Sequence, residues 1–150
     1  NSLPASLDYL SYEHGRLVEI QKKNEADGWT YIGKWTPDDK ASTRDGYVNV
    51  PMLAGNAPGK ILKFKFKGST VGIAVAAGPD AGIIEYSIDG KGWESKDLFT
   101  QWSKWLHLPW YLILGDELKN RSHVLRIRLG NIKNEASTGT VCRIRYFLVN

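Results

Sequence analysis

The sequence predicts an all-β domain, an antiparallel β-sandwich with a jelly-roll-like arrangement of strands. Three observations predict this fold: several short segments alternate apolar with polar residues, turn-forming residues separate them, and patterns with the period of a helix are scarce. Roughly nine such segments, spaced about 8–12 residues apart, are typical of a sandwich. Because composition does not change along the 150 residues, we expect a single domain spanning residues 1–150, with an ordered core from about residue 7 to 149.

The first third of the chain contains three short segments with strand character. Residues 16–21, 29–35 and 47–50 are rich in β-branched and aromatic residues and are separated by polar turns. Trp29 and Trp35 are an even number of residues apart on the second segment, which favours a core position for one and a flanking position for the other.

The middle of the chain has the clearest strand pattern. Residues 60–67 place apolar side chains at positions 62, 64 and 66 and lysines at 63, 65 and 67, which predicts a half-buried strand with a solvated lysine face. Residues 71–77 are apolar throughout and predict a more fully buried strand. Residues 83–88 form the next strand, and the Asp89-Gly90 pair predicts a hairpin turn after it.

The last third continues the same pattern, with strands predicted over residues 110–114, 124–129 and 141–149. Simple alternation along the final strand puts Cys142, Ile144, Tyr146 and Leu148 on one face. Alternation also puts four arginines on the outer faces of the last two strands: Arg126, Arg128, Arg143 and Arg145. Residues 97–106 are compatible with one or two helical turns, which Pro109 would end.

Composition and charge limit which partners and which cellular environment we expect for this chain. The net charge is +4, with cations and carboxylates interspersed, so we do not expect a nucleic-acid partner. The single cysteine, Cys142, has no partner for an internal disulfide, and we expect no membrane span because no apolar run reaches the required length. The chain begins at Asn1, without Met or a signal peptide, which is expected of a mature chain or an excised fragment.

Residues that could catalyse a reaction occur only in weak patterns. Ser103, His107 and Asp97 lie within eleven residues and resemble a triad by type, yet Ser103 has no glycine-flanked turn around it. The acidic residues of the same region are explained equally well by strand faces and turns as by a glycosidase pair. The sequence therefore predicts no catalytic residue.

Metal-binding patterns are equally weak. His14, His107 and His123 are too widely spaced for a ligand motif, and Cys142 stands alone. A calcium ion held by the loop carboxylates Asp80, Asp89 and Asp97 and by backbone carbonyls remains an open alternative, but no EF-hand pattern accompanies it. We predict no metal and no cofactor.

The strongest functional signal is aromatic. Four of the six tryptophans lie between residues 78 and 111, together with a histidine and several turn residues. Trp102 and Trp105 are three residues apart, so they would share a face of a helical turn. Rings of this kind can plug the end of a sandwich, or they can stack on a sugar or on another domain. Asp80, in the Gly-Pro-Asp-Ala-Gly turn at 78–82, could add a hydrogen-bonding group.

Several motifs together resemble a known accessory domain. They are Gly-Tyr-Val-Asn-Val-Pro-Met-Leu at 46–53, Gly-Pro-Asp-Ala-Gly at 78–82, Tyr-Ser-Ile-Asp-Gly at 86–90, Leu-His-Leu-Pro-Trp-Tyr at 106–111 and His-Val-Leu-Arg-Ile-Arg at 123–128. The chain from about residue 7 to 149 resembles the C-terminal-type β-sandwich attached to SGNH/GDSL-like lipase/acylhydrolases of Bacteroidetes and related bacteria.

This resemblance implies a non-catalytic module. The family's Gly-Asp-Ser nucleophile block is absent, and the nearest segment, Gly-Asp-Glu at 115–117, carries Glu in place of the nucleophile. The implied partner is an SGNH-type catalytic domain of the same protein, acting as an esterase on acylated carbohydrate, and the implied location is periplasmic, secreted or on the cell surface. The expected ligand-binding surface consists of Asp80, Trp102, Trp105, His107, Trp110 and Tyr111.

Two alternatives remain open at this stage. The chain could be a purely structural packing module with its aromatic residues buried against a catalytic domain. An autonomous hydrolase is the other alternative, and it would require Ser103 to act as a nucleophile.

Overall fold

The computed structural model describes residues 15–150, so the start of the expected ordered core, from residue 7, and His14 lie outside the described residues. Ten strands and one short 3-10 helix make up the described part of the chain. In order they are β1 (Arg16–Glu19), η2 (Lys22–Asn24), β2 (Trp29–Trp35), β3 (Val50–Gly55), β4 (Leu62–Gly68), β5 (Val71–Ala77), β6 (Ile83–Ile88), β7 (Glu94–Asp97), β8 (Leu108–Gly115), β9 (Arg121–Leu129) and β10 (Cys142–Val149).

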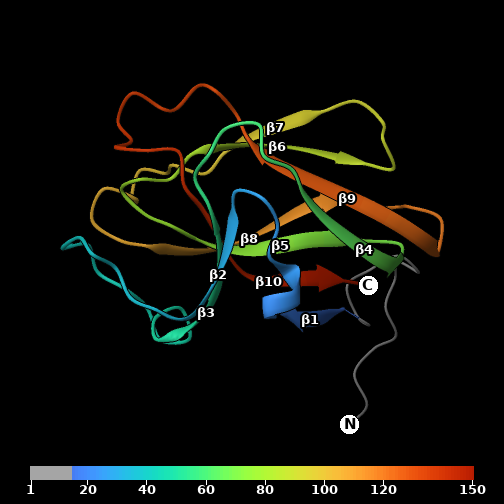
Figure 1. Ribbon diagram of the computed structural model, residues 1–150, viewed down its shortest axis with the longest axis horizontal. Helices are drawn as coiled ribbons and strands as arrows, with labels where there is room; N and C mark the ends of the chain where they lie inside the picture. Colours follow the sequence, from blue (N-terminus) through green and yellow to red (C-terminus); the bar gives the residue numbers. More distant parts are fainter. Residues whose placement is uncertain (1–14) are drawn as a thin grey trace, which may run out of the picture.

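The strands form two sheets that pack face to face (Figure 1). The larger sheet has the order β2-β3-β10-β5-β8, and β1 pairs with the C-terminal half of β10. The smaller sheet has the order β4-β9-β6-β7. Each strand pair is antiparallel, and most neighbours are distant in sequence, as in jelly-roll folds. The all-β antiparallel sandwich predicted from the sequence is confirmed.

The strand predicted over residues 47–50 is wrong. Gly46 has a φ of 81° and Asn49 a φ of 57°, and this left-handed backbone cannot continue a strand. The chain turns there, and β3 begins only at Val50. Residues 101–105 form overlapping hydrogen-bonded turns, and no helix is present in the region 97–106.

The face assignment of the last strand is also wrong beyond its first half. The register of β10 against β5 shifts between Ile144 and Tyr146, which marks a β-bulge. An extra residue in one strand moves every later side chain to the opposite face. Consequently Phe147 and Val149 are buried in the core, whereas Tyr146 and Leu148 lie on the outer face.

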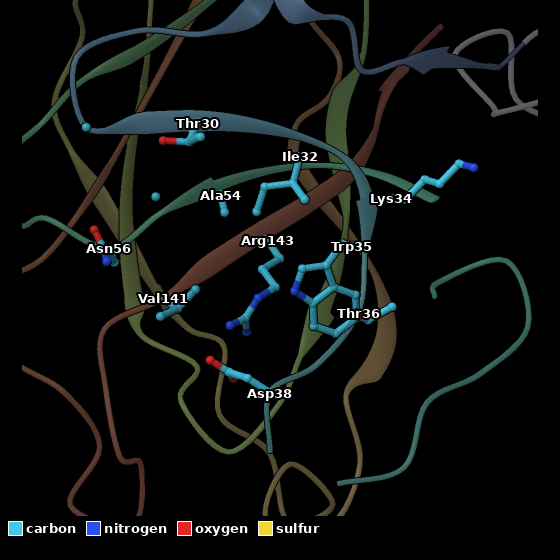
Figure 2. Close-up of a pocket in the computed structure, with 12 residues that line it drawn as sticks. Thr30, Ile32, Lys34, Trp35, Thr36, Asp38, Ala54, Asn56, Val141 and Arg143 are labelled. Carbon is cyan, nitrogen blue, oxygen red and sulfur yellow. The ribbon is translucent and has the colours of Figure 1, made fainter. Parts of the chain in front are cut away.

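The outer face of the larger sheet is partly covered by the 36–49 loop, which joins β2 to β3. A second hydrophobic cluster forms beneath it, made of Trp35, Tyr47, Met52 and Ala76, with Ile32 and Val50 against its edge. Trp35 and Ile32 are drawn in Figure 2. The outward positions of β5 are small, Gly72, Ala74 and Ala76, which leaves room for this covering layer.

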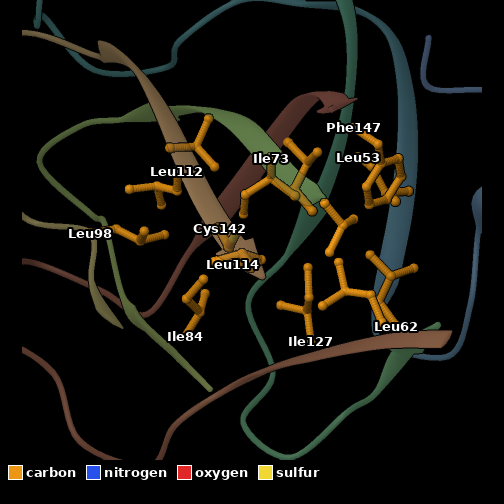
Figure 3. Packing of buried hydrophobic residues seen from close by; sticks show 14 of the residues in the cluster. Leu53, Leu62, Ile73, Ile84, Leu98, Leu112, Leu114, Ile127, Cys142 and Phe147 are labelled. Atoms are coloured by element: carbon orange, nitrogen blue, oxygen red, sulfur yellow. The ribbon is translucent and has the colours of Figure 1, made fainter. Parts of the chain in front are cut away.

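The main core fills the space between the sheets (Figure 3). Leu53, Ile73, Ile84, Ile127 and Ile144 are fully buried there, and each such side chain contributes about 1.5–3 kcal/mol of transfer free energy. Trp29 belongs to this core, and its indole Nε1 donates to the backbone oxygen of Lys60 at 2.9 Å. The two tryptophans of β2 therefore serve different clusters. This core is the rigid base on which the loops at one end are held.

Candidate functional site

Asp80 forms a bidentate ion pair at the loop end of the larger sheet. Its two carboxylate oxygens each accept a hydrogen bond from Arg143 of β10, both at 2.7 Å. Its backbone oxygen accepts from the Val141 N–H, which locks the 78–82 turn against β10. Burial opposes ionisation of Asp80, but the Arg143 guanidinium, aided by nearby His107, outweighs burial and holds the pKa of this carboxyl below its ordinary value.

His107 joins the same region to the 36–49 loop. Its ring is almost fully buried, and Nε2 lies 2.9 and 3.0 Å from the two carboxylate oxygens of Asp39. Because an ionised carboxylate can only accept, Nε2 carries the proton in this contact. The ring meets Trp35 edge-on at a centroid distance of 5.0 Å and packs so closely on Gly78 that a Cβ there would lie 2.1 Å from Nδ1. Gly78 is therefore required to admit the imidazole.

Trp102 and Trp105 lie on a single turn, residues 100–106, that we call the tryptophan turn. The Leu106 N–H donates to the Trp102 oxygen, and buried Ser103 closes the turn by accepting from the Thr100 N–H. The backbone of Ser42 then bonds to both Trp105 and His107, which braces the turn against the 36–49 loop. Although the turn is braced in this way, Trp102 and Trp105 are 54% and 64% exposed.

Trp110 and Tyr111 point to opposite faces of β8. Trp110 is paired with Val75 and packs, half-buried, against the main core, with the Lys96 ammonium 5.2 Å from its ring. Tyr111 is on the outer face and is 56% exposed. The structure thus brings together Asp80 and His107, and also Trp102 and Trp105, but it separates Trp110 from Tyr111.

Ser103, His107 and Asp97 do not form a hydrogen-bonded triad. Ser103 is fully buried and its hydroxyl contacts Thr100, while His107 is engaged with Asp39. Asp97 caps the Phe99 N–H and accepts from the Asn134 side chain. Each of the three has a structural role in the loops instead.

Within residues 15–150, no group of three or more His, Cys, Asp and Glu side chains is arranged to hold a metal ion. Over the same range, none of the helical segments has the length and apolar character that crossing a bilayer requires.

Sequence reasoning missed three members of this region: Asp39, Trp35 as a partner of His107, and Arg143 as the partner of Asp80. Asp80 and Arg143 are 63 residues apart, and His107 is 68 residues from Asp39. No local pattern signals contacts over such separations. The outward position predicted for Arg143 was the one usable hint, and it did not identify a partner.

Comparison with known proteins gives a fold and no family. No protein-family model matches this sequence, and no curated protein matches it. The structure is similar to that of a two-domain esterase active on acetylated mannans, with a TM-score of 0.65 and 15% identity over 99% of this chain and 39% of that chain. It is also similar to a family two carbohydrate esterase from Cellvibrio japonicus, with a TM-score of 0.52 and 13% identity over 90% of this chain and 33% of that one.

A third similar structure is a Paenibacillus xanthan lyase, with a TM-score of 0.54 and 21% identity over 90% of this chain and 12% of that chain. At these identities the comparisons support the β-sandwich fold. This chain spans about two-fifths of the length of the two-domain esterase and less of the other two proteins.

Proposed function

We propose that this chain is a non-catalytic accessory module of a carbohydrate-active enzyme and that it binds carbohydrate through the tryptophan turn. The observation that carries the proposal is the exposure of Trp102 and Trp105 on a turn held by backbone hydrogen bonds. Rings of this size are costly to leave in water, and a rigid turn presents them to a flat ligand at a low entropic cost.

Similarity to solved structures supports the modular part of the proposal. This chain aligns along 99% of its length with only 39% of a two-domain esterase, as an accessory domain would. Together with the motif resemblance, this favours a parent protein of the SGNH/GDSL type, acting as an esterase on acylated carbohydrate outside the cytoplasm. The catalytic domain of that parent is the proposed partner.

The other four predicted residues take supporting roles in this proposal. Asp80 and His107 hold the loops that frame the tryptophan turn, through Arg143 and Asp39 respectively. Trp110 anchors β8 in the main core, and Tyr111 presents an exposed ring on the outer face of the same strand.

A fluorescence titration tests the proposal. Intrinsic tryptophan emission is followed while plant and host polysaccharides, native and acetylated, are added. We expect a saturable shift that is lost in Trp102→Ala and Trp105→Ala, with melting temperatures close to that of the parent chain because both side chains are exposed. The matched control is Trp93→Ala, since this tryptophan stacks on Arg128 and lies on the smaller sheet's side.

A second candidate function, packing against a catalytic domain, is favoured by a separate observation. Leu17, Leu148, Gly72 and Ile113 are register partners on neighbouring strands and form an apolar row across the outer face of the larger sheet. Leu17 and Ile113 are 51% and 40% exposed. A covering domain would remove this row from water. Concentration-dependent self-association that Ile113→Ser abolishes would support the packing function, and a monomer at all concentrations would count against it.

A further inference from the structure

A hollow of about 500 Å³, which we call the outer-face pocket, lies on the outer face of the larger sheet beside the 36–49 loop (Figure 2). Its lining comes from β2, β3, the start of β10 and the loop after β2. The volume falls within the ~300–1,000 Å³ typical of small-molecule sites. None of the six ligand-binding residues predicted from the sequence lines this pocket, so it is a site separate from the tryptophan turn.

The base of the pocket is apolar and its walls are polar. Ile32, Ala54 and Val141 provide apolar surface, and these three side chains are half-buried. Several wall side chains make no hydrogen bond or ion pair with any other residue in 15–150: Thr30, Lys34, Thr36, Asp38 and Asn56. A concave apolar surface with a few polar groups at its edge is the general form of a small-ligand site.

Arg143 differs from the other wall residues because its position is fixed. Asp80 holds two guanidinium nitrogens at 2.7 Å, and the guanidinium carbon lies 5.1 Å from the centre of the Trp35 ring. The Trp35 ring is in turn braced by His107. A guanidinium has five N–H donors, and the bidentate pair uses two, so donors remain for a ligand that enters the pocket.

The charges of the lining indicate what kind of ligand fits. Asp80 offsets Arg143, and Lys34 and Asp38 carry opposite charges on the walls, so the pocket has no net excess of either sign. Such a lining offers both donors and acceptors but no charge for a polyanion to neutralise. A neutral polyhydroxylated ring, with apolar C–H faces and many hydroxyls, matches both the base and the walls.

The geometry points to the outer-face pocket as a binding site for a neutral sugar residue of a carbohydrate chain. The sugar ring rests on Ile32 and Ala54, and its hydroxyls bond to Arg143, Asp38 and Asn56. This inference rests on the proposed carbohydrate-binding function and adds a second, independent subsite to it.

The test is a calorimetric and NMR titration of the chain with mannopentaose, xylopentaose and cellopentaose. The pocket variant is Asp38→Ala/Asn56→Ala, whose side chains are exposed and unpartnered, so folding is retained. Ala54→Leu fills the base without removing a polar group. The matched control is Lys63→Ala, on the outer face of the other sheet.

We expect at least one oligosaccharide to shift the amide resonances of residues 30, 54, 56 and 143. The double variant should weaken its binding by about tenfold, since hydrogen bonds to a charged group are lost. Ala54→Leu should weaken it as well, and Lys63→Ala should leave it unchanged.

The possible failures are distinguishable. Binding that survives both pocket variants and is lost in Trp102→Ala or Trp105→Ala overturns the outer-face pocket and keeps the proposed function. Absence of binding to every oligosaccharide and polysaccharide overturns both. Binding lost only in the pocket variants supports the pocket and removes the tryptophan turn as the contact.

Discussion

The arginines of β10, on the outer face of the larger sheet, have carboxylate partners, whereas, within the described part of the chain, most cations on the outer face of the smaller sheet do not. On the larger sheet, Arg143 pairs with Asp80, and Arg145 pairs with Glu19 at 2.9 Å while also donating to the Gly46 oxygen. On the smaller sheet, four cations have no carboxylate partner within residues 15–150: Lys63, Lys65, Lys67 and Arg126. Arg128, on the same face, does pair with Glu85.

The difference follows from coverage. The 36–49 loop partly covers the larger sheet's outer face, and the side chains of Arg143 and Arg145 are largely buried there. An unpaired guanidinium in such a place would lose its hydration without compensation. The lysine side chains of β4 are exposed to water and need no partner. The cations are therefore of two kinds: the largely buried arginines of β10 are held by carboxylates, whereas the lysines of β4, like Lys34 on β2, are solvated.

Of the substitutions that test this contrast, Arg143→Met should cause the largest loss of stability. It leaves the Asp80 carboxylate without its partner, and the stability loss should be about 2–3 kcal/mol, below the ~3–5 kcal/mol of a fully buried pair because both groups are partly exposed. Urea unfolding measures it. The matched control, Arg126→Met on the smaller sheet, should change stability by less than about 0.5 kcal/mol. Equal small losses in both variants would remove the contrast.

Gly78→Ala should be the next most damaging change. The new Cβ would lie 2.1 Å from the His107 Nδ1, so the imidazole must move away from Asp39 or Trp35. Overpacking of this kind costs roughly 1–3 kcal/mol. Gly92→Ala is the control, since nothing lies within 4 Å of a Cβ there. Thermal unfolding of both variants, with amide exchange of the 36–49 loop, compares them, and an unperturbed loop in Gly78→Ala would contradict the bracing role of His107.

Lowering the pH should reduce the stability of the fold through two carboxylates, Asp80 beside the larger sheet and Asp89 beside the smaller sheet. Burial of Asp80 is outweighed by Arg143, and Asp89 accepts hydrogen bonds from His123 and the Val124 N–H, so the pKa of each lies below its ordinary value. A lowered folded-state pKa adds stability above the unfolded-state pKa of ~3.9, and this stability is lost as the pH falls through the folded-state value.

Urea unfolding between pH 7 and pH 2 checks this expectation. The parent chain should lose stability below about pH 4, and Asp80→Asn and Asp89→Asn should each lose less over the same range because one titrating group is gone. A parallel pH profile in parent and variants would show that these carboxylates do not govern acid unfolding.

The smallest effect concerns the lysine face. Each of Lys63→Gln, Lys65→Gln and Lys67→Gln should change stability by less than about 0.5 kcal/mol, and added salt should reduce any difference by screening the exposed charges. A loss above 1 kcal/mol in any of them would show a structural partner for that lysine and weaken the contrast between the faces.

Local alternation predicted most of the strands correctly. The segment 60–67 shows why: its apolar positions 62, 64 and 66 do face the core, with Phe64 stacked on Phe147 at 3.8 Å. A period of two residues is a property of the strand itself and needs no knowledge of the neighbours. The same rule failed for Tyr146 and Leu148, because a bulge is set by how β10 pairs with β5.

For the candidate site, the sequence predicted which types of residue are involved but not which individual side chains are exposed. Clustering of tryptophans drew attention to residues 102 and 105, which are 54% and 64% exposed. Trp110 and Tyr111 had the same local signal, yet adjacent positions on β8 send one to the core side and the other to the outer face. A cluster of aromatic residues in the sequence therefore does not indicate which of the rings are exposed to solvent.

The local sequence determines the positions of the strands, the alternation of their faces and the locations of the turns, because the pleat of a strand and the chemistry of a turn depend on near neighbours in the chain. The contacts of Asp80 with Arg143 and of Asp39 with His107, and the pocket between β2, β3 and β10, depend instead on which strands become neighbours in the larger sheet. Strand order and register bring residues more than sixty positions apart into hydrogen-bonding distance, and the burial of the whole core determines that order.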